Sequence, residues 1–198
     1  MAGHPPLVLV HGLWDTPRLF RRLQQSLGER RAPLLIPHLP HGLGATPIRD
    51  LADQLGSHIE AAFGPDTPID LLGFSMGGLI GRTWIQLGGG HRRTRRFISV
   101  GSPQQGTLTA QPWPRWLLAG IADMKLGSPL LRALDRHAHL LDGLECHSLY
   151  TPTDVTVCPG WRAVLPKGPR QALPVLTHQQ LMGDPAALAA LVSELLRP

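Results

Sequence analysis

The sequence contains little cysteine, with Cys146 and Cys158 as its two residues of this type. Their spacing matches no zinc-binding or redox motif, so we expect two free thiols in a reducing compartment, with a disulfide as the alternative. The chain also lacks a run of about 18 apolar residues, which argues against a membrane-spanning helix. Residues 1–6 carry neither the basic segment nor the apolar core of a secretion signal. We therefore expect a cytoplasmic protein, with membrane association as an open alternative.

Features that would bind a cofactor or a nucleic acid are missing too. No G-x-G-x-x-G follows an expected strand, and no residues have metal-ligand spacing, so we expect neither cofactor nor metal. The net charge is +5, and part of it lies in the cluster His91-Arg92-Arg93-Thr94-Arg95-Arg96. No aromatic residues interleave with these arginines, so we expect no nucleic-acid partner. We interpret the cluster as a solvated loop, and contact with an anionic membrane surface is the alternative.

Alternating apolar segments predict the fold. The 198 residues suit one domain spanning 1–198. Expected strands are 7–10, 33–37, 69–72, 97–100, 146–150 and, less regularly, 162–165; expected helices are 48–63, 77–87 and 185–196. A further helix has Pro17 in its first turn, with Thr16 or Asp15 as its cap. Strands that alternate with helices predict a three-layer α/β/α fold around a mostly parallel sheet of about six strands. Residues 104–143 interrupt this alternation as an apolar insertion, and we expect them to cover a substrate.

The most informative motif is G-F-S-M-G at residues 73–77. It follows an apolar strand and precedes a helix, which predicts that Ser75 lies on a sharp strand-to-helix turn with its hydroxyl exposed above the sheet. A serine hydroxyl is a weak nucleophile near neutral pH, so it needs a neutral imidazole as base and a carboxylate to orient that imidazole.

Hydrolases with this turn have their partners in the chain order serine, acid, histidine. Asp154 is the best acid, because it follows the expected strand 146–150. His178 is the best base, because it ends the apolar run 174–178 just before the last helix. The less suitable acids are Asp123, Asp135 and Asp142, and the less suitable bases are His137, His139 and His147.

Two backbone N–H groups should stabilise the oxyanion. Met76 supplies one, as the residue after the nucleophile, and Leu13 supplies the other from the loop after the first strand. His11 in this loop has two interpretations, a side chain that braces the loop or a substrate contact, and we favour bracing. Further candidates for substrate contact are Trp14, Trp116 and Leu117.

Several segments together resemble the α/β-hydrolase-fold lipases, and most of all small bacterial triacylglycerol lipases and esterases with a reduced sheet. They are V-H-G-L at 10–13, G-F-S-M-G-G at 73–78, G-S-P-Q-Q-G-T at 101–107, Thr153-Asp154 and Thr177-His178. The resemblance implies carboxylic ester hydrolysis by Ser75, Asp154 and His178. Two positions differ, since such lipases often have histidine at the position of Phe74 and glycine at that of Thr177.

We therefore predict a serine hydrolase that cleaves carboxylic esters, with acyl lipids as the expected substrates. An acyltransferase or thioesterase would use the same residues, and a non-catalytic binding protein is a third alternative. A basic face together with Trp113, Trp116 and Leu117 would suit docking to a membrane, although we favour core packing for the tryptophans. The sequence leaves the oligomeric state open.

Overall fold

The structure is a computed structural model that describes residues 4–198. A six-stranded sheet forms its centre, in the order β2-β1-β3-β4-β5-β6, and all neighbouring strands are parallel. The strands are β1 (Leu7–Val10), β2 (Leu34–Leu35), β3 (Ile69–Phe74), β4 (Thr94–Val100), β5 (Glu145–Tyr150) and β6 (Arg170–Ala172). The predicted parallel sheet of about six strands is confirmed.

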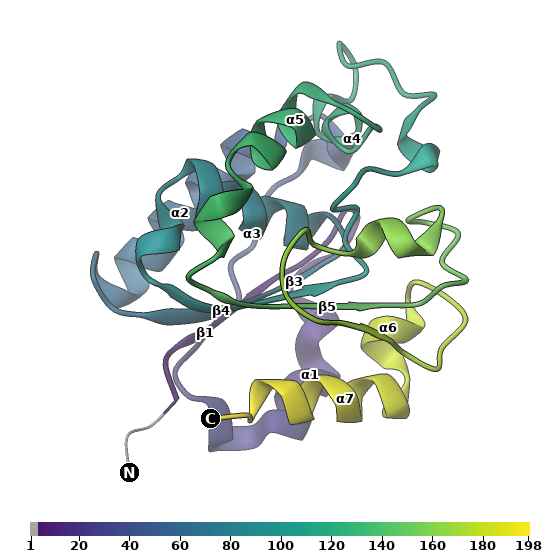
Figure 1. Cartoon of the computed structure of the whole chain (residues 1–198). Coiled ribbons are helices and arrows are strands. Elements are labelled where there is room, and N and C mark those ends of the chain that lie inside the picture. The colour runs from purple at the N-terminus through teal and green to yellow at the C-terminus, as the bar shows by residue number, and fades with distance from the viewer. Residues whose placement is uncertain (1–3) are drawn as a thin grey trace.

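Helices cover both faces of the sheet and make it the middle of three layers (Figure 1). One face carries α1 (Arg21–Leu27), α6 (Gln180–Gly183) and α7 (Pro185–Leu195). The other face carries α2 (Ile48–Phe63) and α3 (Met76–Leu87), with α4 (Ala119–Asp123) and α5 (Pro129–Arg136) packed beside them. The predicted helix 48–63 is confirmed, and α3 and α7 agree with their predictions to within one residue. Asp184 caps α7 by accepting a hydrogen bond from the Ala186 N–H at 2.8 Å.

The strands alternate their side chains between two apolar cores. Val8 and Leu71 pack under α2 and α3, whereas Leu9 and Leu72 pack under α1 and α7. All six residues of β3 are buried, which is why its sequence is mostly apolar rather than alternating; its one charged residue, Asp70, pairs with Arg31 and Arg95. This central strand leads directly to Ser75.

The two edge strands differ from prediction. β2 contains only Leu34–Leu35, because the prolines of the predicted strand 33–37 have no N–H to donate to a ladder. The sixth strand predicted at 162–165 is wrong: residues Gly160–Ala163 form a 3-10 turn, and β6 follows at Arg170–Ala172 with every residue exposed. Leu165 is apolar because it packs into the core under α3, and not because it belongs to a strand.

The first helical segment begins at Pro17 with Thr16 at the cap position, as predicted. It differs in that Pro17–Phe20 form a 3-10 turn ahead of α1, and Thr16 makes no side-chain cap hydrogen bond. The free state predicted for Cys146 and Cys158 is confirmed.

The arginine cluster is a solvated turn only in its first part, where Arg92 is exposed; the second part belongs to β4, which begins at Thr94. Arg96 is fully buried; it pairs with Glu145 at 2.8 Å and donates to the carbonyls of Arg197 and Pro198. Arg95 pairs with Asp70. Arg96 therefore joins β4 to the carboxyl end of the chain, and Arg95 joins β4 to β3, so both arginines have a role within the structure.

Residues 104–143 contain α4, α5 and short 3-10 turns, and they lie over the carboxyl ends of the strands near α2 and α3 (Figure 1). Within residues 4–198, no helix is long and apolar enough to cross a membrane.

Candidate active site

Ser75 occupies the tight turn between β3 and α3 with the backbone angles φ 54° and ψ −130°. A positive φ is unfavourable for a residue with a side chain and persists only where the surroundings impose it. Glycines on either side make the turn possible: a Cβ at Gly73 would lie 2.4 Å from the Gly78 Cα, and one at Gly77 would lie 2.1 Å from the Val10 carbonyl. The predicted turn is therefore present, with Ser75 at its apex.

Asp154 and His178 lie 24 residues apart in the chain and form a hydrogen bond of 2.6 Å from His178 Nδ1 to Asp154 Oδ2. Asp154 follows β5, and its other oxygen accepts the N–H groups of Thr156 and Val157 at 2.8 and 2.9 Å. Both side chains are buried, with exposed fractions of 4% for Asp154 and 5% for His178. The carboxylate is thus held from two sides, and it fixes the imidazole with its Nε2 free.

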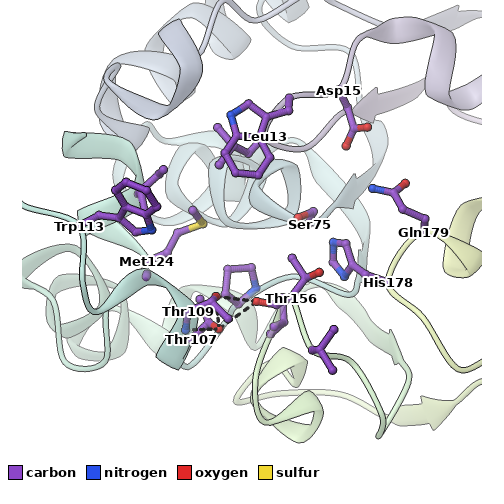
Figure 2. A pocket seen from close by; sticks show the side chains of 16 residues that line it. Leu13, Asp15, Ser75, Thr107, Thr109, Trp113, Met124, Thr156, His178 and Gln179 are labelled. Atoms are coloured by element: carbon purple, nitrogen blue, oxygen red, sulfur yellow. Dashed lines mark hydrogen bonds between the residues drawn. The ribbon is translucent and has the colours of Figure 1, made fainter. Parts of the chain in front are cut away.

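His178 Nε2 is buried and has no hydrogen-bond partner among residues 4–198. His178 and Ser75 line the same cavity, where the imidazole and the serine side chain lie next to one another (Figure 2). The imidazole packs against the Phe74 ring with a centroid separation of 4.8 Å. Gly101 also lies close to the imidazole, since a Cβ at Gly101 would lie 3.2 Å from His178 Cε1. Phe74, which differs from the histidine common in the lipases, therefore helps to orient His178.

The loop after β1 meets the nucleophile turn closely. A Cβ at Gly12 would lie 2.7 Å from the Ser75 Cβ. The backbone N–H groups of Leu13 and Met76 have no acceptor among the residues that the structure describes, and Met76 begins α3. A helix N-terminus and a free N–H on the facing loop are the kinds of donor that can stabilise an oxyanion.

His11 braces this loop through both of its ring nitrogens, which agrees with the interpretation favoured from the sequence. It is 1% exposed; its Nδ1 donates to the Gly12 carbonyl at 3.1 Å, and its Nε2 accepts the Leu39 N–H at 3.1 Å. Burial lowers the pKa of His11 despite the hydrogen bond to Gly12, and the nearby His38 and His41 lower it further. A neutral imidazole suits this pair of bonds. The alternative of a substrate contact is not supported, because His11 does not line the cavity.

The cavity has a volume of about 370 Å³. One end is apolar, and it is formed mainly by Leu13 and by residues of the 104–143 segment: Ala110, Trp113, Ile121 and Met124. Trp14 lines the cavity, as predicted, whereas Trp116 and Leu117 do not. Trp113 is 44% exposed and Trp116 is 84% exposed, so the expectation that these tryptophans pack in the core is wrong for both.

Threonine hydroxyls join the insertion to the loop that carries Asp154. Thr107 Oγ1 accepts the Cys158 N–H at 2.9 Å, and Thr109 Oγ1 donates to the Thr156 carbonyl at 2.7 Å. Leu108 N–H also donates to the Cys158 carbonyl at 3.0 Å. Figure 2 shows these hydroxyls beside Thr156 on one wall of the cavity. The insertion therefore holds the acid loop in place as well as covering the cavity.

The sequence does not predict several polar residues of this cavity, among them Asp15 and Gln179 on one side and the threonines Thr107, Thr109 and Thr156 on the other. From the sequence, Asp15 is only a candidate helix cap. The positions of Asp15 and Gln179 next to Trp14 and His178 were the available signal. Within residues 4–198, no group of three or more His, Cys, Asp or Glu side chains is arranged to hold a metal ion.

Residues 5–145 of the chain match a family model described as alpha/beta hydrolase fold. The human (Homo sapiens) lysosomal thioesterase PPT2 is 30% identical over 121 residues, which cover 59% of this chain and 39% of PPT2. The PPT2 of Bos taurus is 29% identical over 124 residues, with the same shares of the two chains. The chain thus spans well under half the length of these curated relatives.

Solved structures share the fold at low identity. The mature lipase BlEst2 of Bacillus licheniformis has a TM-score of 0.77 at 15% identity, covering 98% of this chain and 93% of the lipase. Aspergillus fumigatus lipase B has a TM-score of 0.74 at 18% identity, covering 98% of this chain and 53% of that one. The match at residues 5–145 includes both the loop after β1 and the Ser75 turn. Because it covers more than half of the sequence, the chain belongs to the alpha/beta hydrolase fold family.

Proposed function

We propose that this protein is a serine hydrolase that cleaves carboxylic esters through an acyl-enzyme. The observation that carries the proposal is the buried pair of His178 and Asp154, with the free Nε2 of His178 beside Ser75 in one cavity. In this arrangement the carboxylate selects the imidazole tautomer that can accept a proton from serine, and it stabilises the imidazolium that forms.

The reaction follows from these positions. Ser75 Oγ attacks the ester carbonyl while its proton moves to His178 Nε2, and the carbonyl oxygen takes the negative charge between the N–H groups of Leu13 and Met76. The C–O bond then breaks, and the leaving alcohol takes the proton from Nε2. Water attacks the acyl-enzyme with His178 as base, which releases the acid and restores Ser75.

The acyl group of the substrate would occupy the apolar end of the cavity, against Leu13, Ile121 and Met124. Two apolar side chains that line the cavity, Trp113 and Val155, are also exposed to solvent. Exposed apolar side chains at a cavity favour an acyl-lipid substrate and peripheral contact with a lipid surface. The free thiols of Cys146 and Cys158 suit a reducing compartment, and we place the protein in the cytoplasm on that ground.

Thioester hydrolysis is the second candidate, and one observation favours it. The curated relatives that share 29–30% identity are named as thioesterases, and the same residues could attack a thioester carbonyl. An acyltransferase would differ only in accepting an alcohol instead of water at the second step.

The test is hydrolysis of p-nitrophenyl esters from acetyl to palmitoyl, beside the S-phenyl thioesters of the same acids, with Ser75→Ala as the matched variant. We expect turnover that the variant loses, and an optimal chain length that separates an esterase from a lipase. Preferred thioester cleavage would favour the second candidate, and added alcohol would reveal acyl transfer in the products. Full activity of a folded Ser75→Ala protein would overturn the proposal.

A further inference from the structure

The cavity at Ser75 has two chemically different ends. Trp113 and Met124 lie at the apolar end, whereas Asp15 and Gln179 lie on the opposite side of Ser75 with His178 (Figure 2). If the proposed function holds, His178 must protonate the leaving atom, so the leaving group has to lie on the side of His178. The acyl chain then takes the apolar end, and the leaving alcohol or thiol enters the end that contains Asp15.

The Asp15 carboxylate has no partner within residues 4–198. It takes part in no salt bridge within the described chain, and its oxygens accept no hydrogen bond from a side chain or backbone group there. Partial burial raises its pKa, against the opposing influence of His178 and His41. A carboxylate that is partly withdrawn from water and unpaired favours a cation that would restore the lost interactions.

Trp14 stands next to Asp15 and also lines the cavity. Its backbone lies in the left-handed region at φ 63°, and its N–H is fixed by a hydrogen bond to His41 Nε2 at 3.1 Å. Strained residues of this kind persist where the surroundings hold them, often at ligand sites. The indole is 67% exposed, and an indole face attracts organic cations.

We propose that Trp14, Asp15 and Gln179 form a leaving-group subsite that selects esters or thioesters whose alcohol or thiol carries a positive charge. Asp15 supplies the opposite charge, and Trp14 supplies an aromatic face. The side-chain amide of Gln179 points into the same end of the cavity (Figure 2) and can accept or donate a hydrogen bond there. The inference rests on the proposed function for its orientation of the substrate.

The test compares two esters of nearly the same shape, butyrylcholine and 3,3-dimethylbutyl butyrate. Butyrylcholine has a positively charged quaternary nitrogen where the other ester has a neutral quaternary carbon. The wild-type protein should prefer butyrylcholine by about tenfold in kcat/KM, which is the effect of one favourable cation contact. The preference should fall as salt is added. Asp15→Asn should abolish it by slowing only the choline ester, and Asp53→Asn, far from this cavity, should leave it unchanged.

A second variant tests the role of charge by an expected gain, because a loss of activity can also come from general damage to the site. Gln179→Glu adds a second carboxylate at the same end, so it should raise the preference for butyrylcholine several-fold. No preference in the wild-type protein would overturn the subsite, as would an Asp15→Asn variant that slows both esters equally, because Asp15 would then act through His178. A wild-type protein that hydrolyses neither these esters nor p-nitrophenyl butyrate would overturn the proposed function itself, and the subsite with it.

Discussion

Replacing Asp154 with asparagine should abolish most activity while preserving the shape of the site. Asp154 Oδ1 accepts two backbone N–H groups, from Thr156 and Val157. In Asp154→Asn these two donors keep the amide oxygen at the Oδ1 position, because an NH2 group there would face two N–H groups. The amide NH2 is therefore forced toward His178 Nδ1, in place of Oδ2.

An NH2 donor at this place reverses the tautomer of His178. Nδ1 must accept, so the proton moves to Nε2, and the imidazole loses the lone pair that would accept the proton of Ser75. An equivalent change in a serine hydrolase costs about 10⁴ in turnover, which corresponds to about 5 kcal/mol of transition-state stabilisation. Loss of one charge-assisted hydrogen bond should cost only about 1–3 kcal/mol in the free energy of unfolding.

The assay is turnover of p-nitrophenyl butyrate together with urea denaturation of the same preparations. Asp184→Asn is the matched control, because Asp184 caps α7 and asparagine caps a helix about as well as aspartate; it should keep wild-type turnover. An Asp154→Asn protein that retains more than about a tenth of wild-type turnover would refute the reasoning, since its loss would be far below that 10⁴.

Three further predictions concern packing and burial. Gly12→Ala places a Cβ 2.7 Å from the Ser75 Cβ and displaces the Leu13 donor, so turnover should fall by about 10²–10³ while circular dichroism stays unchanged; normal turnover would contradict the close approach. Asp70→Asn leaves the buried Arg31 without its carboxylate at 2.8 Å. Urea denaturation should then show a free energy of unfolding lower by about 3 kcal/mol, and a decrease below about 1 kcal/mol would contradict this prediction. Burial raises the pKa of Cys146 to about 11, so the unfolded chain loses this proton first as the pH rises; the stability contributed by the neutral thiol is complete below about pH 8.5 and declines above it by about 1.4 kcal/mol per pH unit. Urea denaturation of the wild type and of Cys146→Ala at pH 8 and pH 10 measures this decline, and equal pH dependence in both proteins would contradict it.

Chain order was enough to find the side chains that meet at the site. Ser75 follows a mostly apolar strand and precedes a helix, and Asp154 and His178 each follow an apolar segment, so all three come at the carboxyl ends of strands or just beyond them. Parallel strands bring such positions to one edge of the sheet. The rule depends only on local pattern and order, both of which a sequence displays.

Features that depend on distant partners were not predictable in this way. Arg96 looked like part of a solvated cluster because its partner Glu145 is 49 residues away. Asp15 looked like a helix cap because the cavity it lines is completed by the distant Gln179. β6 was not predictable for another reason. An exposed edge strand has no buried face, so its sequence carries no apolar pattern.

The central claim is that Ser75 is a nucleophile activated by His178, and covalent labelling tests it most directly. A fluorophosphonate probe is added to the wild-type protein, and the modified residue is located by mass spectrometry of the peptides. The account predicts one adduct per chain, on Ser75, with ester hydrolysis lost in proportion to labelling and labelling much slower in Asp154→Asn. A folded protein that hydrolyses esters but carries its adduct on another serine, or forms none, would contradict it.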